Sequence, residues 1–327
     1  MSRHRIIIDA DPGVDDAAAV LMALASPEIE VLGLSIVAGN VALKDTVANA
    51  CKIVGLSGRK DVSVHAGASG PLLRAQVYGK YVEIGSFDDA LVAPGDIVPS
   101  DEHAVHFIVR MARAAAVACD PITLCAIGPL TNVALALIQH PDVAKGIGRI
   151  VSMGGAFTAL GHRTPWAEFN IYADPHAAEI VYTSGVPVVV MPLDMTFQAL
   201  FKAEHFQQLR DRGGKAGAAL FNLFSAFDRS DIKRFGRAGG PIHDATTIAW
   251  LLQPELFKSR RAAVGVQVTG LTMGHTYADF YRKMDRSPQA DVVTDVDENG
   301  FIELLIERIS YYGSASSQSK PPGGRKP

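Results

Sequence analysis

Residues 5–25 read RIIIDADPGVDDAAAVLMALA, and this stretch decides the fold. The run Arg5–Asp9 is rich in isoleucine, which favours a buried strand, and Val14–Ala25 is an apolar, alanine-rich segment of helical length. Proline at position 12 is typical of the first turn of a helix, where a missing backbone N–H loses no partner. The stretch therefore predicts a strand, a tight turn rich in carboxylates, and a helix.

The same alternation continues along the chain. Short β-branched runs predict further strands at residues 31–37, 122–127, 149–153, 187–191, 263–268 and 290–295. Longer runs rich in alanine and leucine predict helices at 44–56, 102–117, 130–139, 175–184 and 244–252. Most of the strands are apolar on both faces, which is typical of a parallel sheet covered by helices on both sides. We therefore expect an α/β, doubly wound, Rossmann-like fold in a single domain.

The domain is expected to span residues 1–313. The segment 314–327, SASSQSKPPGGRKP, is polar and rich in Pro, Gly and Ser, so we expect it to be a disordered tail. The least regular internal stretch, 71–99, is expected to be a surface excursion or flap.

The charge balance argues against nucleic acids and membranes as partners. The 327 residues include 31 Lys and Arg against 34 Asp and Glu, a formal net charge of -3, so no basic field gathers polyanions. No apolar run approaches the roughly 20 residues of a membrane span. The three cysteines, Cys51, Cys119 and Cys125, form no C-x-x-C pair, which is typical of a reducing compartment. We expect a cytoplasmic protein that acts on small molecules.

Four carboxylates, Asp9, Asp11, Asp15 and Asp16, fall within the strand-to-helix turn. Their mutual repulsion is costly unless a cation lies among them. Calcium and magnesium prefer such oxygen ligands, so the cluster predicts a metal site. The alternative is an ordinary helix start, with Asp11 as the cap and Asp15 and Asp16 favoured by the helix dipole. Asp9 belongs to the strand and is expected to orient the other carboxylates.

Two other clusters of polar residues follow later in the chain. His243 and Asp244 precede an apolar helical stretch, a pattern that an ordinary helix start also explains. Glu168 and Asn170 lie two residues apart in a segment expected to be extended, so their side chains share one side. Two polar groups on one side of a buried segment suit the hydroxyls of a sugar.

Together these segments resemble the nucleoside hydrolase family, the inosine-uridine preferring nucleoside N-ribohydrolases, from Ile6 to about Ile309. The motif D-x-D-P-G-x-D-D at residues 9–16 is highly specific to that family. The other shared motifs, in the family's order, are VAGN at 37–40, AIGPLTN at 126–132, MGG at 153–155, AEFN at 167–170 and PIHDA at 241–245. The resemblance implies hydrolysis of the N-glycosidic bond of ribonucleosides to ribose and free base, as in nucleoside salvage.

The resemblance also implies a Ca2+ cofactor and a set of site residues. The metal ligands would be the carboxylates of Asp11, Asp16 and Asp244 and the main-chain carbonyl of Ile127. Asp11 would also be the general base that activates a metal-bound water as nucleophile, and His243 would act on the departing base. The substrate-binding residues would be Asp15, Asn40, Tyr78, Met153, His162, Glu168 and Asn170. A homodimer or homotetramer is implied as well.

The sequence departs from the family pattern on the leaving-group side of the site. Many members carry His-Gly where Tyr78-Gly79 stands here, and an asparagine where His162 stands. Tyrosine has an unperturbed pKa of about 10 and is a poorer acid at neutral pH. His243 is therefore the better candidate to protonate or hydrogen-bond a base nitrogen. The preferred nucleobase stays open.

Two other functions fit parts of the pattern. The D-x-D of Asp9 and Asp11 also begins the motif of haloacid dehalogenase-like phosphatases, although the following Pro12-Gly13 does not fit that motif. The changes at Tyr78 and His162 motivate a non-catalytic, calcium-dependent binder of nucleosides or ribose.

Two further segments have a structural interpretation beside a functional one. The aromatic-rich stretch 221–235 either closes over the base or forms the apolar face of a helix. Residues 295–300, DVDENG, begin like an EF-hand loop, but its twelfth position is Ile306 rather than glutamate. A strand-to-helix turn with Asn299 as the cap fits this segment better.

Overall fold

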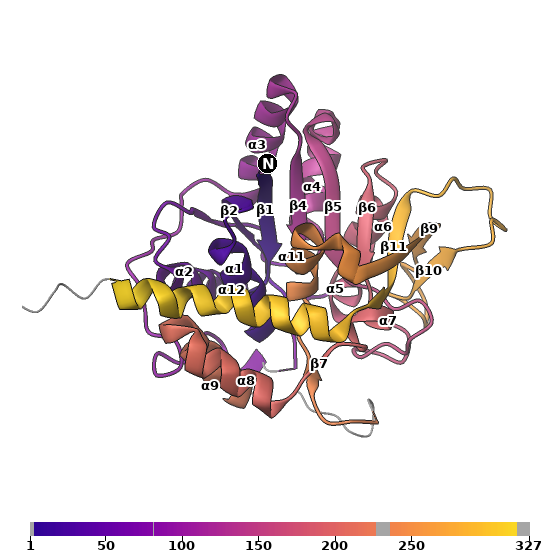
Figure 1. Cartoon of the computed structure of the whole chain (residues 1–327). Coiled ribbons are helices and arrows are strands. Elements are labelled where there is room, and N and C mark those ends of the chain that lie inside the picture. Colours follow the sequence, from indigo (N-terminus) through magenta and orange to yellow (C-terminus); the bar gives the residue numbers. More distant parts are fainter. Residues whose placement is uncertain (1–2, 81, 227–235, 319–327) are drawn as a thin grey trace, which may run out of the picture.

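A computed structural model describes residues 3–80, 82–226 and 236–318. Its centre is one nine-stranded sheet in the order β10-β9-β11-β6-β5-β4-β1-β2-β3 (Figure 1). The strands are β1 (His4–Ala10), β2 (Ile29–Ile36), β3 (Val64–Ala66), β4 (Ile122–Ala126), β5 (Ile147–Met153), β6 (Val188–Met191), β9 (Phe257–Val266), β10 (Thr276–Asp279) and β11 (Ala290–Val296). β9 runs antiparallel to β10 and β11, and the remaining neighbours are parallel. The expected mostly parallel sheet is confirmed.

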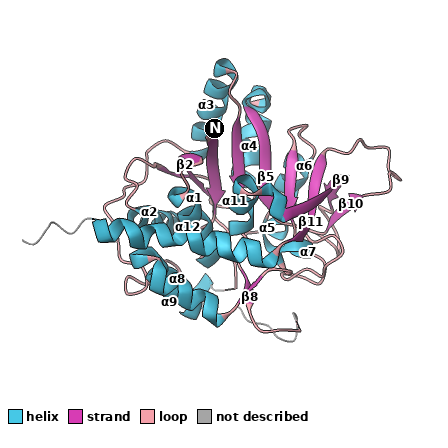
Figure 2. Ribbon diagram, in the orientation of Figure 1, coloured by secondary structure: helices cyan, strands magenta, loops and turns pink. Residues whose placement is uncertain are grey.

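Helices cover both faces of this sheet (Figure 2). One face carries α1 (Val14–Ala25), α2 (Leu43–Ser57), α9 (Gly214–Ala226), α11 (Ala245–Leu252) and α12 (Glu298–Gln318). The other face carries α3 (Ala104–Ala118), α4 (Thr131–Gln139) and α6 (Pro175–Tyr182). The remaining elements are the helices α5 (Phe169–Ala173), α7 (Leu193–Thr196) and α8 (Ala203–Arg212) and the two-stranded sheet of β7 (Leu200–Phe201) and β8 (Gly240–Pro241).

The isoleucines of β1 explain why this strand is central. Ile6 and Ile8 pack into the apolar cluster on one face of the sheet, and Ile7 packs into the cluster on the other face. All three side chains are fully buried, as the strand period of two requires for a strand covered on both faces. Truncating one of them to alanine is expected to cost about 2–5 kcal/mol of unfolding free energy.

The winding of the chain reverses between β1 and β4. β2 and β3 lie on one side of β1, whereas β4, β5 and β6 lie on the other. In doubly wound sheets the ligand crevice opens at such a point, beyond the carboxyl ends of the strands. Asp11 follows β1 there and Ile127 follows β4, and the Ile127 N–H donates a 2.8 Å hydrogen bond to the Asp9 carbonyl oxygen. The fold therefore joins the two strand ends at which the sequence predicts a metal site.

The structure corrects the expectations at the C-terminal end of the chain. The strand expected at 263–268 begins at Phe257 and ends at Val266. Asn299 is not the cap of the last helix, because the carboxylate of Asp297 accepts the Gly300 N–H at 3.2 Å instead. The helix continues to Gln318 and so includes residues 314–318 of the expected tail, whose disorder stays a prediction. Residues 319–327 of the expected tail lie outside the described residues.

Residues between β3 and α3 form the expected excursion. In the described part of this stretch, the only helical turn is the 3-10 turn Val82–Ile84. The excursion is nonetheless attached to the domain, because Phe87 and Val92 are buried in the core cluster that includes α1 and α2. Among the described residues no helix is both long and apolar enough to cross a membrane.

Candidate active site

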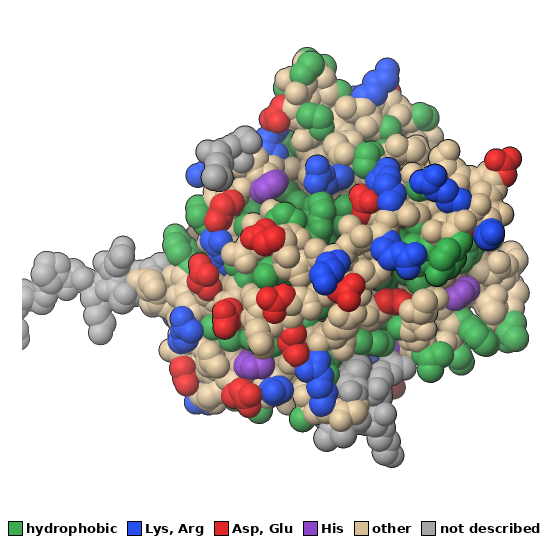
Figure 3. Space-filling view, turned by 45° about the vertical axis from the view of Figure 1, so that its right-hand side comes forward, with side chains coloured by type: hydrophobic (Ala, Val, Ile, Leu, Met, Phe, Trp, Pro, Cys, Tyr) green, Lys and Arg blue, Asp and Glu red, His purple; other side chains and the backbone are tan. Residues whose placement is uncertain are grey.

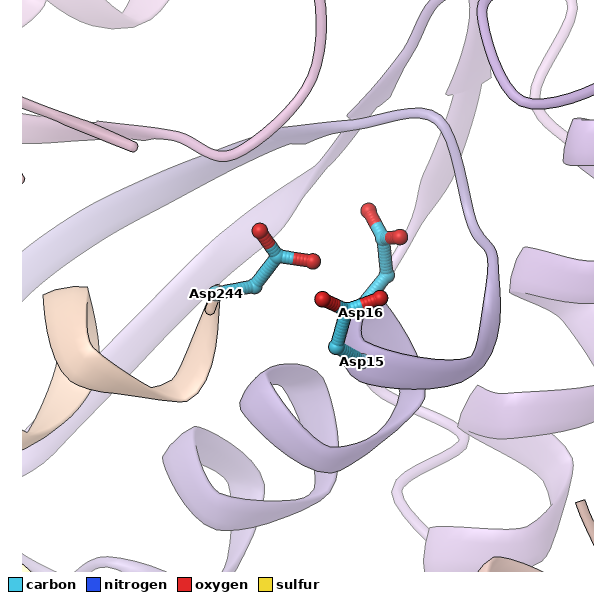
Figure 4. Close-up of side chains that lie close together, drawn as sticks. All are labelled: Asp15, Asp16 and Asp244. Atoms are coloured by element: carbon cyan, nitrogen blue, oxygen red, sulfur yellow. The ribbon is translucent and has the colours of Figure 1, made fainter. Parts of the chain in front are cut away.

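Three carboxylates from two distant parts of the chain meet in space. Oxygen atoms of Asp15, Asp16 and Asp244 all lie within 4.8 Å of one another (Figure 4). Asp15 and Asp16 belong to the first turn of α1, and Asp244 immediately precedes α11. Oxygen ligands of one calcium ion, each about 2.3–2.6 Å from it, are separated by at most about 5 Å. The spacing therefore suits a single hard cation.

The two oxygens of the Asp16 carboxylate differ in their hydrogen bonding. Its Oδ2 accepts the Gly13 N–H at 2.8 Å, which satisfies a free donor at the start of α1. Its Oδ1 is buried and has no hydrogen-bond partner among the residues that the structure describes. A buried carboxylate oxygen without a donor is costly, and a bound cation would remove that cost. This orphaned atom fits the predicted role of Asp16 as a metal ligand.

Asp11 lies in a cradle formed by two glycines. The Asn40 N–H donates to Asp11 Oδ2 at 2.6 Å, and Asn40 Nδ2 donates to the Asp11 carbonyl oxygen at 3.0 Å. A Cβ atom at Gly39 would lie 2.1 Å from Asp11 Oδ2, and one at Gly128 would lie 2.7 Å from Asp11 Oδ1. Glycine at both positions therefore lets the two strand-end loops close around this carboxylate. The structure thus brings together Asp11 and Asn40, two residues that the sequence assigns to the site.

Burial sets the electrostatics of the acidic loop. Desolvation, and after it the charge of Asp15, raise the pKa of the Asp16 carboxyl to about 7. Desolvation, and then the Asp16 charge, raise the pKa of Asp11 well above its ordinary value. Both shifts oppose the ionised forms, and a nearby cation would favour those forms again. The charge pattern is that of a site built around a positive ion.

Asp9 belongs to a separate buried network. Its Oδ1 accepts hydrogen bonds from Ser35 Oγ at 2.5 Å and from Asn132 Nδ2 at 2.9 Å, while its Oδ2 has no partner in residues 3–80, 82–226 and 236–318. Asn132 also accepts the Ala68 N–H at 2.8 Å, so it links β1 to the start of the excursion. Desolvation raises the pKa of Asp9 to about 7 in spite of the two hydrogen bonds. These contacts support a role for Asp9 in holding strand ends.

Asn170 and Glu168 form the wall opposite the acidic loop. Asn170 Nδ2 donates to the carbonyl oxygens of Ile127 at 2.8 Å and Met153 at 3.1 Å. The sequence predicts that Glu168 and Asn170 share an extended segment, and this prediction is wrong. Glu168 is instead the N-cap of α5, where its Oε2 accepts the Ile171 N–H at 3.2 Å. A short helix was missed there because five residues do not establish a helical period. Both side chains are buried in the described structure.

Two histidines approach each other beside this wall. His162 Nε2 lies 3.3 Å from Glu168 Oε1, and its ring centroid is 5.7 Å from that of His243. His243 Nδ1 lies 2.8 Å from Thr196 Oγ1, so α7 fixes the orientation of its ring. The structure therefore gathers His162, Glu168, His243 and Asp244 from loops that are far apart in the sequence.

Tyr78 is the predicted site residue that belongs to the excursion. It is half-buried, and the N–H of the next residue, Gly79, donates to the Asn40 carbonyl oxygen at 3.0 Å. The excursion therefore places the Tyr78 segment beside Asn40, which holds Asp11.

The described part of the aromatic stretch 221–235 belongs to a helix and contributes to its apolar face. Phe224 is buried in α9 and stacks on Phe206 with ring centroids 4.7 Å apart, as expected for the apolar face of a helix. Residues 227–235 lie outside the described residues, so the expected closure over the base is not tested.

Sequence patterns missed two residues that organise the site. Thr196, which orients His243, belongs to a four-residue helix that has no detectable period. Asp194, two residues earlier, accepts the N–H groups of Phe157 and Thr158 at 2.9 Å and 2.7 Å and so anchors the loop that leads to His162. The only sequence signal for Asp194 was a single acidic residue shortly after a predicted strand.

Comparison with known proteins identifies the family to which this site belongs. Residues 6–303 match the family described as inosine-uridine preferring nucleoside hydrolase. The chain belongs to the nucleoside hydrolase family. The pyrimidine-specific ribonucleoside hydrolase RihA of Salmonella paratyphi B is 43% identical over 313 residues, which cover 94% of this chain and 98% of RihA.

Solved structures agree with this assignment. A plant nucleoside hydrolase, the PpNRh1 enzyme, superposes with a TM-score of 0.85 at 30% identity, covering 94% of this hydrolase and 99% of that chain. A purine-preferring ribonucleoside hydrolase from Gardnerella vaginalis gives a TM-score of 0.84 at 32% identity, covering 95% and 99%. The predicted family, Rossmann-like fold and enzyme class, an N-glycosyl hydrolase of ribonucleosides, are confirmed. The phosphatase alternative is thereby set aside.

Proposed function

We propose that this hydrolase is calcium-dependent and that the acidic loop holds the ion. The proposed ligands are the carboxylates of Asp11, Asp16 and Asp244 and the carbonyl of Ile127. Asp15 lies beside Asp16 and Asp244, and this position favours an auxiliary role for its carboxylate at the same ion. The observation that carries the proposal is the buried Asp16 Oδ1, which has no partner within the described part of the chain and lies beside two further carboxylates. Calcium is favoured over magnesium because it tolerates irregular sets of oxygen ligands. Bound there, the ion would fix the ribose diol and acidify a water molecule.

We assign the hydrolytic step to Asp11. Its carboxylate is the proposed general base that accepts the proton of the attacking water while the N-glycosidic bond breaks. The Asn40 N–H, 2.6 Å from Asp11 Oδ2, orients this base. Cleavage of such bonds passes through a state with positive charge on the sugar ring, and the surrounding carboxylates would stabilise that charge.

The wall formed by Asn170 and Glu168 is assigned to substrate binding. Glu168, Asn170 and Met153 would contact the ribose, with Asn40 and Asp15 on the other side of it. His162, whose Nε2 lies 3.3 Å from Glu168 Oε1, and Tyr78 are assigned to the same substrate-binding set, and His243 would hydrogen-bond the departing base. Glu168, Asn170 and Met153 are buried, and Asn170 is held by the carbonyls of Ile127 and Met153. Such fixed groups would restrict the ribose to one orientation, which is how binding energy contributes to the rate.

The proposed substrates are pyrimidine ribonucleosides. The similarity to RihA, at 43% identity, supports this choice over purines, for which the solved relative is 32% identical. The proposal extends to a homodimer or homotetramer in the cytoplasm, with ribonucleosides as the small-molecule partner. Light scattering of the purified chain tests the oligomeric state.

The experiment that tests the function measures ribose release from inosine, adenosine, guanosine, uridine and cytidine. We expect calcium-dependent release that is greatest for uridine or cytidine and is lost after exhaustive chelation. Asp11→Asn is expected to reduce turnover by a factor of about 100 or more. The matched control is Asp61→Asn, which alters a surface carboxylate paired with Arg59 and should leave turnover unchanged. Nucleoside binding without turnover by the wild-type chain would instead support the non-catalytic binder.

A further inference from the structure

Two side chains of α2 hold one residue of the excursion by its backbone. Asn49 Oδ1 accepts the Phe87 N–H at 2.7 Å, and Lys52 Nζ donates to the Phe87 carbonyl oxygen. Asn49 and Lys52 lie three residues apart, which places them on one face of the helix. All three residues are buried, with at most 9% exposure. The excursion is therefore attached to α2 through both backbone groups of Phe87.

The same asparagine also reaches the acidic loop. Asn49 Nδ2 donates to the Pro12 carbonyl oxygen at 2.9 Å. That carbonyl and the Gly13 N–H belong to one planar peptide group, and the Gly13 N–H donates to Asp16 Oδ2 at 2.8 Å. A continuous series of hydrogen bonds thus runs from Phe87 through Asn49 and this peptide group to Asp16. In a buried setting each bond of such a series polarises and strengthens the next.

We propose that Asn49 is a positioning residue that couples the excursion to the metal ligand Asp16. The inference rests on the calcium site of the proposed function. Because the Pro12–Gly13 peptide group is rigid, losing the bond at its carbonyl lets its N–H tilt away from Asp16 Oδ2. Asp16 Oδ1 then loses the fixed direction that a cation requires.

The coupling acts in both directions. A bound cation that fixes Asp16 also fixes the Pro12–Gly13 peptide group, and through Asn49 it favours the attached position of Phe87. Thermodynamic linkage requires that the factor by which calcium favours the attached position of Phe87 equals the factor by which the attached chain binds calcium more tightly. Lys52 differs from Asn49, because within the described residues its Nζ donates to Phe87 and Asp89 of the excursion and not to the acidic loop.

Calcium titration of the full chain by calorimetry tests the proposal. Asn49→Ala is expected to weaken calcium binding by a factor of about 10 to 100, as is usual when a group supporting a metal ligand is removed. Asn49→Leu, which fills the same volume without the amide, is expected to weaken it by a similar factor. Lys52→Met keeps the bond to Pro12 and is expected to change the affinity by less than about threefold.

A matched control lies one turn earlier on α2. Thr46→Val removes a buried hydroxyl that donates to the Leu43 carbonyl oxygen of the same helix at 2.9 Å, so it should leave calcium affinity unchanged. A folded Asn49 variant that binds calcium as tightly as the wild type overturns the coupling while leaving the proposed function intact. A wild-type chain that binds no calcium overturns the proposed site, and the coupling with it.

Hydrogen exchange of the wild-type chain decides the matter if both Asn49 variants fail to fold. Calcium is expected to slow exchange of the Phe87 N–H by a factor of about 10, because the affinity change and the attachment change are equal by linkage. The comparison amide is Ser100, at the end of the same excursion, whose N–H donates to Val64 at 2.7 Å. Equal effects of calcium on Phe87 and Ser100 overturn the proposal.

Discussion

The side-chain amide of Asn170 donates a 2.8 Å hydrogen bond to the main-chain carbonyl oxygen of Ile127. This bond connects the predicted sugar-binding wall to the carbonyl predicted as a metal ligand. A carbonyl oxygen has two lone pairs, so it can accept this bond and still face a cation. The two halves of the site are therefore mechanically joined before any substrate arrives. Figure 3 shows one outer face of the domain, on which acidic and basic side chains are interspersed.

Asn170→Ala is expected to weaken both calcium binding and substrate binding. Loss of the amide frees the carbonyls of Ile127 and Met153, so calcium affinity should fall by about tenfold and KM should rise by at least as much. Calorimetry and steady-state kinetics measure the two effects separately. Asn299→Ala, at an exposed position of α12, is the control. A rise in KM with unchanged calcium affinity would show that Asn170 touches the sugar alone.

Gly39→Ala is expected to inactivate the hydrolase without unfolding it. The added Cβ would lie 2.1 Å from Asp11 Oδ2, so the proposed general base must move. We expect kcat to fall by about 100-fold or more, since a general base contributes roughly that factor. Gly70→Ala is the matched control, because its Cβ would meet only Gln76 at an ordinary 3.4 Å. Thermal melting should show both variants folded, and a Gly39→Ala enzyme of normal kcat contradicts the cradle.

The acidic loop was predictable from sequence because its chemistry is contiguous. Four aspartates at one strand-to-helix turn indicate a cation site without knowledge of the fold, and the alternation of strands and helices places that turn at a sheet edge. The contact of Asn49 with Pro12 spans 37 residues and has no local signature. The same holds for Thr196 and His243, which are 47 residues apart. Such partners depend on how helices pack, which periodicity does not specify.

Acidic pH is expected to destabilise the fold through His65. Its ring stacks on Phe107 with centroids 4.0 Å apart, and burial lowers its pKa although Glu102 opposes the shift. Below pH 6.5 the unfolded chain then binds more protons than the folded one. The contribution of neutral His65 is therefore complete above pH 6.5 and is lost as pH falls toward the lower folded-state pKa.

Urea unfolding of wild type and His65→Gln between pH 5 and pH 8 measures this contribution. The wild-type free energy of unfolding should approach that of the variant as pH falls. Taking the difference between the two proteins removes the titration of the buried aspartates, which both share. A difference that stays constant over the range, or grows toward acid, contradicts the assignment to His65.

His243, rather than Tyr78, is expected to assist the departing base. His243→Gln should lower kcat on uridine by about 100-fold or more, because loss of a general acid typically costs that factor. The same variant should retain nearly full activity on p-nitrophenyl riboside, whose leaving group is stable as an anion and needs no proton. Tyr78→Phe keeps the aromatic ring and removes only the hydroxyl, so kcat on uridine should change by less than about threefold. If Tyr78→Phe shows the selective loss on uridine and His243→Gln does not, the tyrosine is the acid, and this hydrolase has moved that role into the excursion.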